Sequence, residues 1–188
     1  MLFNSIDFAI FLPIVFSLYW FVFKSIKSQN VLIVISSYIF YGWWDWRFLS
    51  LILFSTIVDY FVGVKLKNEN IEQKRKFLLL LSVLTNLGFL GFFKYYNFFL
   101  QNFVDAFSFF GFSVSSNSLN IILPVGISFY TFQTLSYTID VYRKKLAPTT
   151  DFISFSAFVC FFPQLVAGPI ERATHLLPQF YKSRLFNY

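Results

Sequence analysis

Residues 123–145 read LPVGISFYTFQTLSYTIDVYRKK, and this stretch decides how the rest of the chain is interpreted. It is apolar enough for a membrane helix, begins with a Pro and a Gly, and ends in three cations. It also contains many side chains that form hydrogen bonds, namely Ser128, Thr131, Gln133, Thr134, Ser136, Tyr137, Thr138 and Asp140. Because polar groups in hydrocarbon cost free energy unless they have partners, we expect this helix to face protein or a cavity and not lipid.

The composition of the whole chain is typical of a membrane protein. Of its 188 residues, 57% are hydrophobic, only 13% are charged, and 30 are Phe. Soluble domains are about 25% charged, so this chain has too few charges to cover a surface that faces water. Dense aromatic residues suit lipid contact and the interfacial belts of membrane proteins. The expected fold class is therefore an all-α integral membrane protein, built as a bundle of several spans.

Apolar runs of suitable length locate the spans, since a crossing needs about 20 apolar residues. We predict spans at residues 6–23, 31–44, 48–64, 77–93 and 121–142. The aromatic, interrupted sequence from Lys94 onwards predicts a short interfacial or tilted helix, and SVSSNSLN (113–120) predicts a polar loop. The last apolar run, 152–162, is too short to cross. With the Pro and Gly residues after it, it predicts a re-entrant or broken helix near 152–172.

The positive charges predict an orientation. Most of them follow the first span, the third span and the polar helix: Lys24, Lys27, Lys65, Lys67, Lys74, Arg75, Lys76, Arg143, Lys144 and Lys145. Arg47 and Lys94 lie on the other side of the predicted spans. Cytoplasmic loops are rich in Lys and Arg, so the three clusters are expected in the cytoplasm, with KLKNENIEQKRK (65–76) as a solvated loop. The N-terminus of this multi-pass chain is then outside.

The polar residues of the 121–142 span have helical spacing. Positions i, i+3, i+4 and i+7 are occupied by Gln133, Ser136, Tyr137 and Asp140, with Ser128 and Thr131 expected near the same side. The opposite side is expected to be mostly apolar or aromatic, with Ile127, Tyr130, Thr134 and Val141. Two interpretations are open: the polar side chains bond neighbouring helices, or they line a cavity that reaches into the membrane. Asp140 is also placed to pair with Arg143, three residues later.

FFPQLVAGPIER (161–172) raises the same question of unpaired polar groups. Pro163, Gly168 and Pro169 are expected to break the helix, which exposes backbone groups. At membrane depth such groups are tolerated only when they are buried in protein or line a cavity. Glu171 and Arg172 could bind an anionic headgroup or pair with each other.

The two residues best suited to catalysis lie in unsuitable surroundings. Cys160 stands in an apolar run, which favours a small core residue. His175 is the only His of the chain, and no Ser, Cys or Asp lies at a useful spacing from it, so we expect it to be solvated or interfacial. No metal site is predicted, because His, Cys and the acidic residues show no metal-ligand spacing.

The motifs LPVGISFYTFQTLSYTIDVYR (123–143) and FFPQLVAGPIER (161–172) resemble the membrane-bound O-acyltransferase family. The resemblance is to its bacterial branch, which includes alginate O-acetylation proteins and relatives that act on peptidoglycan or transfer D-alanine. MLFNSIDFAIFLPIVFSLYW (1–20), SYIFYGWWDWRFL (37–49) and FFKYYNFF (92–99) resemble the opening segments of that branch. The resemblance implies a many-helix enzyme of the bacterial inner membrane. It would pass acyl groups, expected to be acetyl groups, from a cytoplasmic donor towards an extracytoplasmic polysaccharide.

The resemblance also implies where a site would lie. The polar helix and the break would belong to the cytoplasmic-side core around a tunnel. The candidate wall residues are Gly126, Ser128, Gln133, Tyr137, Asp140, Arg143, Pro163, Gln164, Gly168, Pro169 and Arg172. No bound cofactor is expected, and the donor would be acetyl-CoA or an acyl carrier.

Members of the family are longer than this chain and carry their catalytic His in a later helix, so that role is not given to His175. The chain is expected to be the N-terminal part of such an enzyme, with no catalytic residue of its own. The alternative is a non-catalytic membrane scaffold or a remnant subunit. Expected partners are the lipid bilayer, a His-bearing C-terminal segment or second chain, and an extracytoplasmic acetyltransferase. Cations at the ends of apolar runs argue against binding of nucleic acid.

Overall fold

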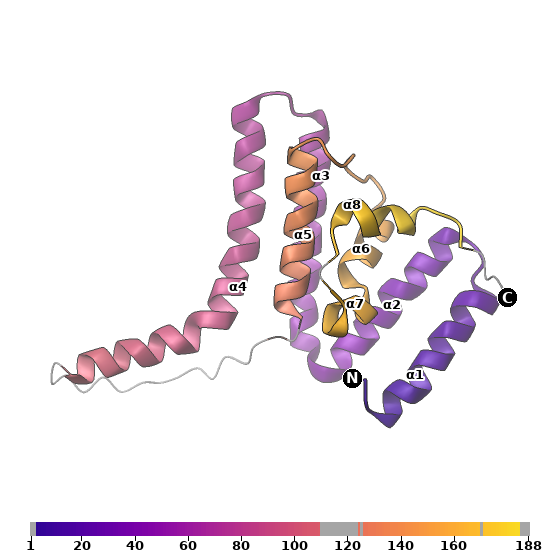
Figure 1. Ribbon diagram of the computed structural model, residues 1–188, viewed down its shortest axis with the longest axis horizontal. Helices are drawn as coiled ribbons and strands as arrows, with labels where there is room; N and C mark the ends of the chain where they lie inside the picture. Colours follow the sequence, from indigo (N-terminus) through magenta and orange to yellow (C-terminus); the bar gives the residue numbers. More distant parts are fainter. Residues whose placement is uncertain (1–2, 110–123, 125, 170, 185–188) are drawn as a thin grey trace.

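The computed structural model describes residues 3–109, 124, 126–169 and 171–184. All secondary structure in these ranges is helical, which confirms the all-α class for this part of the chain (Figure 1). In chain order the elements are α1 (Ile6–Ser17), the π-helical turn η1 (Leu18–Val22), α2 (Ile26–Asp45), the 3-10 turn η2 (Trp46–Phe48), α3 (Leu49–Asn68), α4 (Glu72–Phe109), α5 (Ile127–Tyr142), α6 (Phe152–Cys160), α7 (Phe162–Ala167), α8 (Ala173–Leu176) and the 3-10 turn η3 (Leu177–Phe180).

The polar helix α5 lies at the centre of this arrangement. It packs against α3 and the first part of α4, and on its other side it contacts α6, α7 and α8 (Figure 1). α6 lies on α2, and α1 runs along the outside of α2. The side chains of Tyr137, Phe155, Phe158 and Leu165 are completely buried, so the core sits where α5, α6 and α7 meet.

Two helical stretches are long and apolar enough to cross a membrane, namely 26–68 and 72–104. Two shorter apolar stretches, 6–22 and 152–165, accompany them. Large apolar side chains point outwards along α1, α3 and α4. Contiguous exposed apolar surface is rare on proteins that face water, so these helices are suited to contact with lipid or with further protein.

α2 begins five residues earlier than the predicted span at 31–44. Ser25 caps the helix by accepting a hydrogen bond from the backbone N–H of Ser28. The polar residues that follow are buried with partners inside the protein: Gln29 donates to the backbone oxygen of Tyr19, and Asn30 donates to Ser154. The prediction left Gln29 and Asn30 outside the span because the sequence does not show that distant residues of the protein accept their hydrogen bonds.

α4 is one helix of 38 residues, whereas the sequence predicted a span at 77–93 and a separate helix from Lys94. Figure 1 shows it bending so that its second part leaves the bundle. The helix continues because residues 94–109 contain neither Pro nor Gly, the residues that most often end one. The predicted polar loop at 113–120 lies outside the described residues.

α5 starts later than the predicted span at 121–142, of which residues 121–123 lie outside the described residues. Gly126 precedes the helix with φ of +79°, a left-handed conformation that is costly for residues with a side chain. A Cβ atom there would also lie 3.1 Å from the Tyr41 hydroxyl and 3.2 Å from the Leu165 backbone oxygen. Gly126 therefore lets α5 begin in close contact with α2 and α7.

Arg75 is buried, which corrects the prediction that residues 65–76 form a solvated loop. Most of that stretch is helical, and only residues 69–71 join α3 to α4. Arg75 donates to the backbone oxygens of Leu66 (2.7 Å), Glu69 (3.1 Å) and Tyr142 (2.8 Å). Carbonyls at helix C-termini lack partners within the helix and attract cations. Arg75 thus joins the ends of α3 and α5 and brings two of the predicted cation clusters to one end of the bundle.

Candidate functional site

Two residues of the predicted polar stripe, Gln133 and Tyr137, are buried as expected. The Gln133 side-chain amide donates to the backbone oxygen of Phe158 at 2.6 Å. The Tyr137 ring lies 4.6 Å from the ring of Phe155, and its hydroxyl accepts a hydrogen bond from the Thr149 backbone N–H. Both side chains link α5 to α6, and Tyr137 also binds the Thr149 backbone. This agrees with the first of the two interpretations, in which the polar side chains bond neighbouring helices.

The expected division of α5 into a polar and an opposite apolar side was wrong. The supposed opposite side, Ile127, Tyr130, Thr134 and Val141, is also buried. Ser128, Ser136 and Asp140 are partly exposed, and Phe132 is the exposed residue of the helix. At 100° per residue, Thr131 stands about 160° around the helix from Gln133, so the two never shared a face. α5 is polar because protein surrounds most of it.

The predicted pair between Asp140 and Arg143 does not form among the described residues. α5 ends at Tyr142, and Arg143 is its exposed C-cap residue, whose backbone N–H still donates to the Ile139 oxygen. Asp140 contributes its backbone oxygen instead, which accepts hydrogen bonds from the N–H groups of Lys145 and Leu146. Asp140 and Arg143 mark the end of α5 that is remote from Gly126, about 24 Å away at 1.5 Å per residue.

A buried carboxylate in α3 was not singled out from the sequence. Asp59 is completely buried, and its Oδ1 accepts hydrogen bonds from the hydroxyls of Ser82 (2.5 Å) and Thr138 (3.3 Å). Its Oδ2 accepts from the side-chain amide of Asn86 at 2.8 Å. These donors come from α4 and α5, and no cation pairs with Asp59 in the described ranges. One acidic side chain therefore connects three helices.

Asn86 extends this network to a second layer. Its Oδ1 accepts from the hydroxyls of Ser55 (2.7 Å) and Thr134 (3.2 Å), both buried. The signal available in the sequence was an acid inside a predicted span, four residues after a Ser, with a Ser and an Asn four apart in the next span. We call Ser55, Asp59, Ser82, Asn86, Thr134 and Thr138 the Asp59 network.

The predicted break after Cys160 is present, but its position differs. Phe161 interrupts the helix with ψ of 100°, and Pro163 lies in the first turn of α7, where no backbone N–H is needed. Pro163 therefore helps to start a helix, contrary to the prediction that it breaks one. α7 ends at Ala167 and is capped by Gly168, where a Cβ atom would lie 2.7 Å from the Cα atom of Gln164. The re-entrant character of the segment stays a prediction.

Three buried polar atoms without partners lie on elements that meet at the start of α5. They are the hydroxyls of Tyr41 and Tyr130 and the Oε1 atom of Gln164. The Gln164 amide nitrogen donates to the backbone oxygen of Pro169, so only its oxygen is unpaired. Buried polar atoms without partners are rare because they lose their hydrogen bonds to water. This junction therefore has hydrogen-bonding capacity that the described residues do not use.

The residues that could carry acid–base or nucleophilic chemistry lie elsewhere. His175 is exposed, as expected, and its Nδ1 lies 3.0 Å from Glu171 Oε2. Pairing of Glu171 with Arg172, one of the two alternatives for these residues, does not occur between them in the structure: Arg172 is exposed, and Glu171 contacts His175 instead. Cys160 is buried in the core, as expected. In the described ranges the one imidazole of the chain, His175, contacts a carboxylate and no hydroxyl or thiol.

Comparison with known proteins gives several relatives. The chain is 40% identical over 182 residues to the probable alginate O-acetylase AlgI of Pseudomonas syringae, and 38% identical over 182 residues to that of Pseudomonas aeruginosa. It is 34% identical over 208 residues to the peptidoglycan O-acetyltransferase of Helicobacter pylori. Each match covers 96% of this chain but 34% to 38% of the relative, so the chain spans about a third of the length of these proteins. No family model and no solved structure matches the chain.

Proposed function

Because the chain is homologous to the N-terminal part of alginate and peptidoglycan O-acetyltransferases of the membrane-bound O-acyltransferase family, we propose that it is the N-terminal portion of such an enzyme. The observation that carries this proposal is the 40% identity to an alginate O-acetylase, which extends over 96% of the chain. The whole enzyme would be a multi-pass protein of the bacterial inner membrane. It would pass acetyl groups from a cytoplasmic donor, acetyl-CoA or an acyl carrier, towards an extracytoplasmic polysaccharide.

The part of this chain that we assign to the wall of the acyl tunnel is the junction of α5 with α2 and α7. The unpaired atoms of Tyr41, Tyr130 and Gln164 support this assignment, since a polar substrate passing there would satisfy them. Gly126 and Gly168 allow the backbone to approach closely at the same place. Gln133 and Tyr137 would hold the wall in position through their contacts with α6.

We predict that the isolated 188-residue chain releases no free CoA from acetyl-CoA above background, because its one imidazole is exposed and no nucleophile lies beside it. Acetylation should appear when the chain is fused to the remainder of a relative. The test is a chimera in which this chain replaces the matching N-terminal part of the Pseudomonas syringae alginate O-acetylase. The measurement is the acetyl content of alginate made by cells that carry only the chimera.

The control for this experiment is His175→Ala in the chimera, which should leave acetylation unchanged because His175 lies on the surface. Turnover by the isolated chain that disappears in His175→Ala would make His175 catalytic. A chimera that reaches the normal amount in the membrane but adds no acetyl groups would favour the scaffold alternative.

We further propose that the N-terminus is outside and that residues 65–76 and 143–145 face the cytoplasm. Arg75 brings these two cation clusters to one end of the bundle, while Arg47 follows α2 at the other end (Figure 1). The prediction is that a reporter fused at Asn68 gives a cytoplasmic signal and one fused at Arg47 gives an external signal. The reverse pair of signals would mean that the charge distribution does not set the orientation of this chain.

A further inference from the structure

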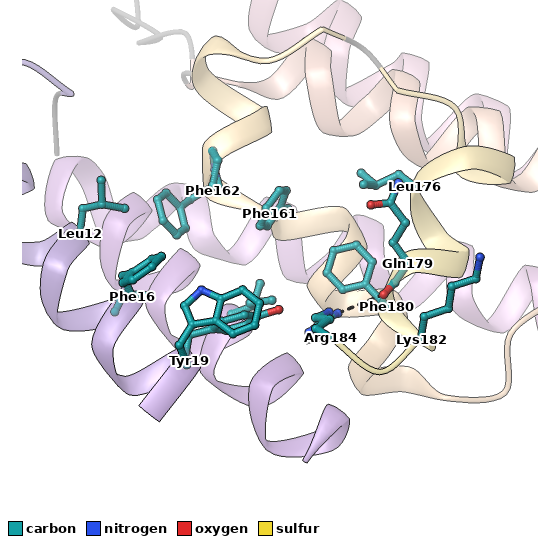
Figure 2. A pocket seen from close by; sticks show the side chains of 14 residues that line it. Leu12, Phe16, Tyr19, Phe161, Phe162, Leu176, Gln179, Phe180, Lys182 and Arg184 are labelled. Carbon is teal, nitrogen blue, oxygen red and sulfur yellow. Dashed lines mark hydrogen bonds between the residues drawn. The ribbon is translucent and has the colours of Figure 1, made fainter. Parts of the chain in front are cut away.

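A groove of about 560 Å³ lies between α1 and the segment that follows α6 (Figure 2). The residues that line it come from α1, η1, α2, the junction of α6 with α7, and the chain from α8 onwards. This volume is in the range of sites for small molecules. None of the lining residues is acidic, and the lining does not include Tyr41, Gly126, Tyr130 or Gln164 of the junction that we assign to the tunnel wall.

The two ends of the groove differ in chemistry. Figure 2 shows Leu12, Phe16 and Phe162 at one end, where the walls are apolar. The other end carries Lys182 and Arg184. Tyr19 lies between them, and Trp20 also lines the groove. Aromatic residues of these two types favour the level of lipid headgroups, where an apolar region meets a polar one.

Arg184 is held in place at the polar end. Its Nη2 donates to the Oδ1 atom of Asn30 at 2.9 Å, and its guanidinium lies 5.6 Å from the Tyr19 ring and 5.4 Å from the Phe180 ring. Its other hydrogen bonds, to Gln29 Oε1 (3.5 Å) and the Gln179 backbone oxygen (3.4 Å), are long. Lys182 is exposed and has no ion pair or hydrogen bond in the described ranges. Lys182 therefore offers free donors close to the fixed positive charge of Arg184.

We propose that this groove binds an anionic phospholipid, with an acyl chain along the wall of α1 and the headgroup phosphate between Lys182 and Arg184. A hydrocarbon chain suits the apolar end because it would be removed from water there, and an anion suits the polar end because it can accept charge-assisted hydrogen bonds from the cations. A phospholipid offers both within one molecule, and Tyr19 and Trp20 line the groove with the aromatic types that favour the headgroup level. The positive charges of the site favour anionic over zwitterionic headgroups.

The test is lipid binding by the 188-residue chain, purified in detergent and stripped of lipid, with bound lipid counted by native mass spectrometry. Phosphatidylglycerol should bind more tightly than phosphatidylcholine with the same acyl chains. Lys182→Ala should weaken phosphatidylglycerol binding about fivefold, since one cation near a membrane surface contributes about 1 kcal/mol. Lys67→Ala, which removes an exposed cation at the end of α3, should leave binding unchanged.

Leu12→Trp narrows the apolar end and should weaken binding of both lipids, while the midpoint of thermal unfolding stays that of the unaltered chain. Glycerol phosphate, which has the anion but no acyl chain, should not compete with the lipid. Equal binding of the two lipids, equal losses in Lys182→Ala and Lys67→Ala, or full competition by glycerol phosphate would each overturn the proposal. None of these outcomes depends on acetyl transfer, so this inference and the proposed function can fail separately.

Discussion

Replacing Asp59 with Leu is expected to lower the free energy of unfolding by about 3 kcal/mol, because three buried donors lose their acceptor. The hydroxyls of Ser82 and Thr138 can turn back to carbonyls of their own helices, which limits their share of the loss. The amide of Asn86 cannot recover in this way. One of its hydrogens already bonds the Ser82 backbone oxygen, and the other is left unpaired between helices.

Asp59→Asn separates the loss of the acceptor from the loss of shape. It keeps one acceptor oxygen and the size of the side chain, so the expected loss is about 1 kcal/mol. Asn68→Leu, a polar-to-apolar change at the exposed end of the same helix, should cost less than 0.5 kcal/mol by the usual rule of about ±0.5 for surface changes. The measurement is unfolding by SDS titration in mixed micelles. A loss in Asp59→Leu no larger than in Asn68→Leu would show that the Asp59 network does not stabilise the fold.

The sequence predicted well what depends on one helix at a time. Long apolar runs gave the helical stretches, and the many polar groups of α5 predicted that it faces protein or a cavity; the burial of Gln133 and Tyr137 agrees with protein. The burial of Cys160 and the exposure of His175 followed from the residues beside them. Local composition decides these features, so a single sequence carries them.

The features that were missed depend on how helices meet. Asp59 has partners 23, 27 and 79 residues away, and no spacing within α3 shows that they lie opposite it. Arg75 looks like one more cation of a charged stretch until its contact with Tyr142 of α5 is known. The predicted faces of α5 failed for a second reason. Protein surrounds most of α5, so its polar residues are not confined to one stripe.

α3 and α5 lie close together at Gly63: a Cβ atom there would lie 2.7 Å from Cε1 and 2.9 Å from Cζ of Tyr137. Tyr137 cannot move away easily, because its ring packs on Phe155 and its hydroxyl holds the Thr149 backbone. Overpacking of a dense core typically costs about 1–3 kcal/mol. Gly63→Ala should therefore lower the free energy of unfolding by about 3 kcal/mol, the upper end of that range.

The second change that tests this prediction is Tyr137→Leu, which removes the ring atoms that the new methyl group would meet. In the double variant, Gly63→Ala should cost much less than it does alone, so the two changes should not be additive. Gly88→Ala in α4 is the matched control, since nothing lies within 4 Å of a Cβ atom there and Ala favours helix more than Gly does. SDS titration again gives the free energies. Equal costs for Gly63→Ala with and without Tyr137 would mean that another contact, and not this ring, limits how closely α3 and α5 pack.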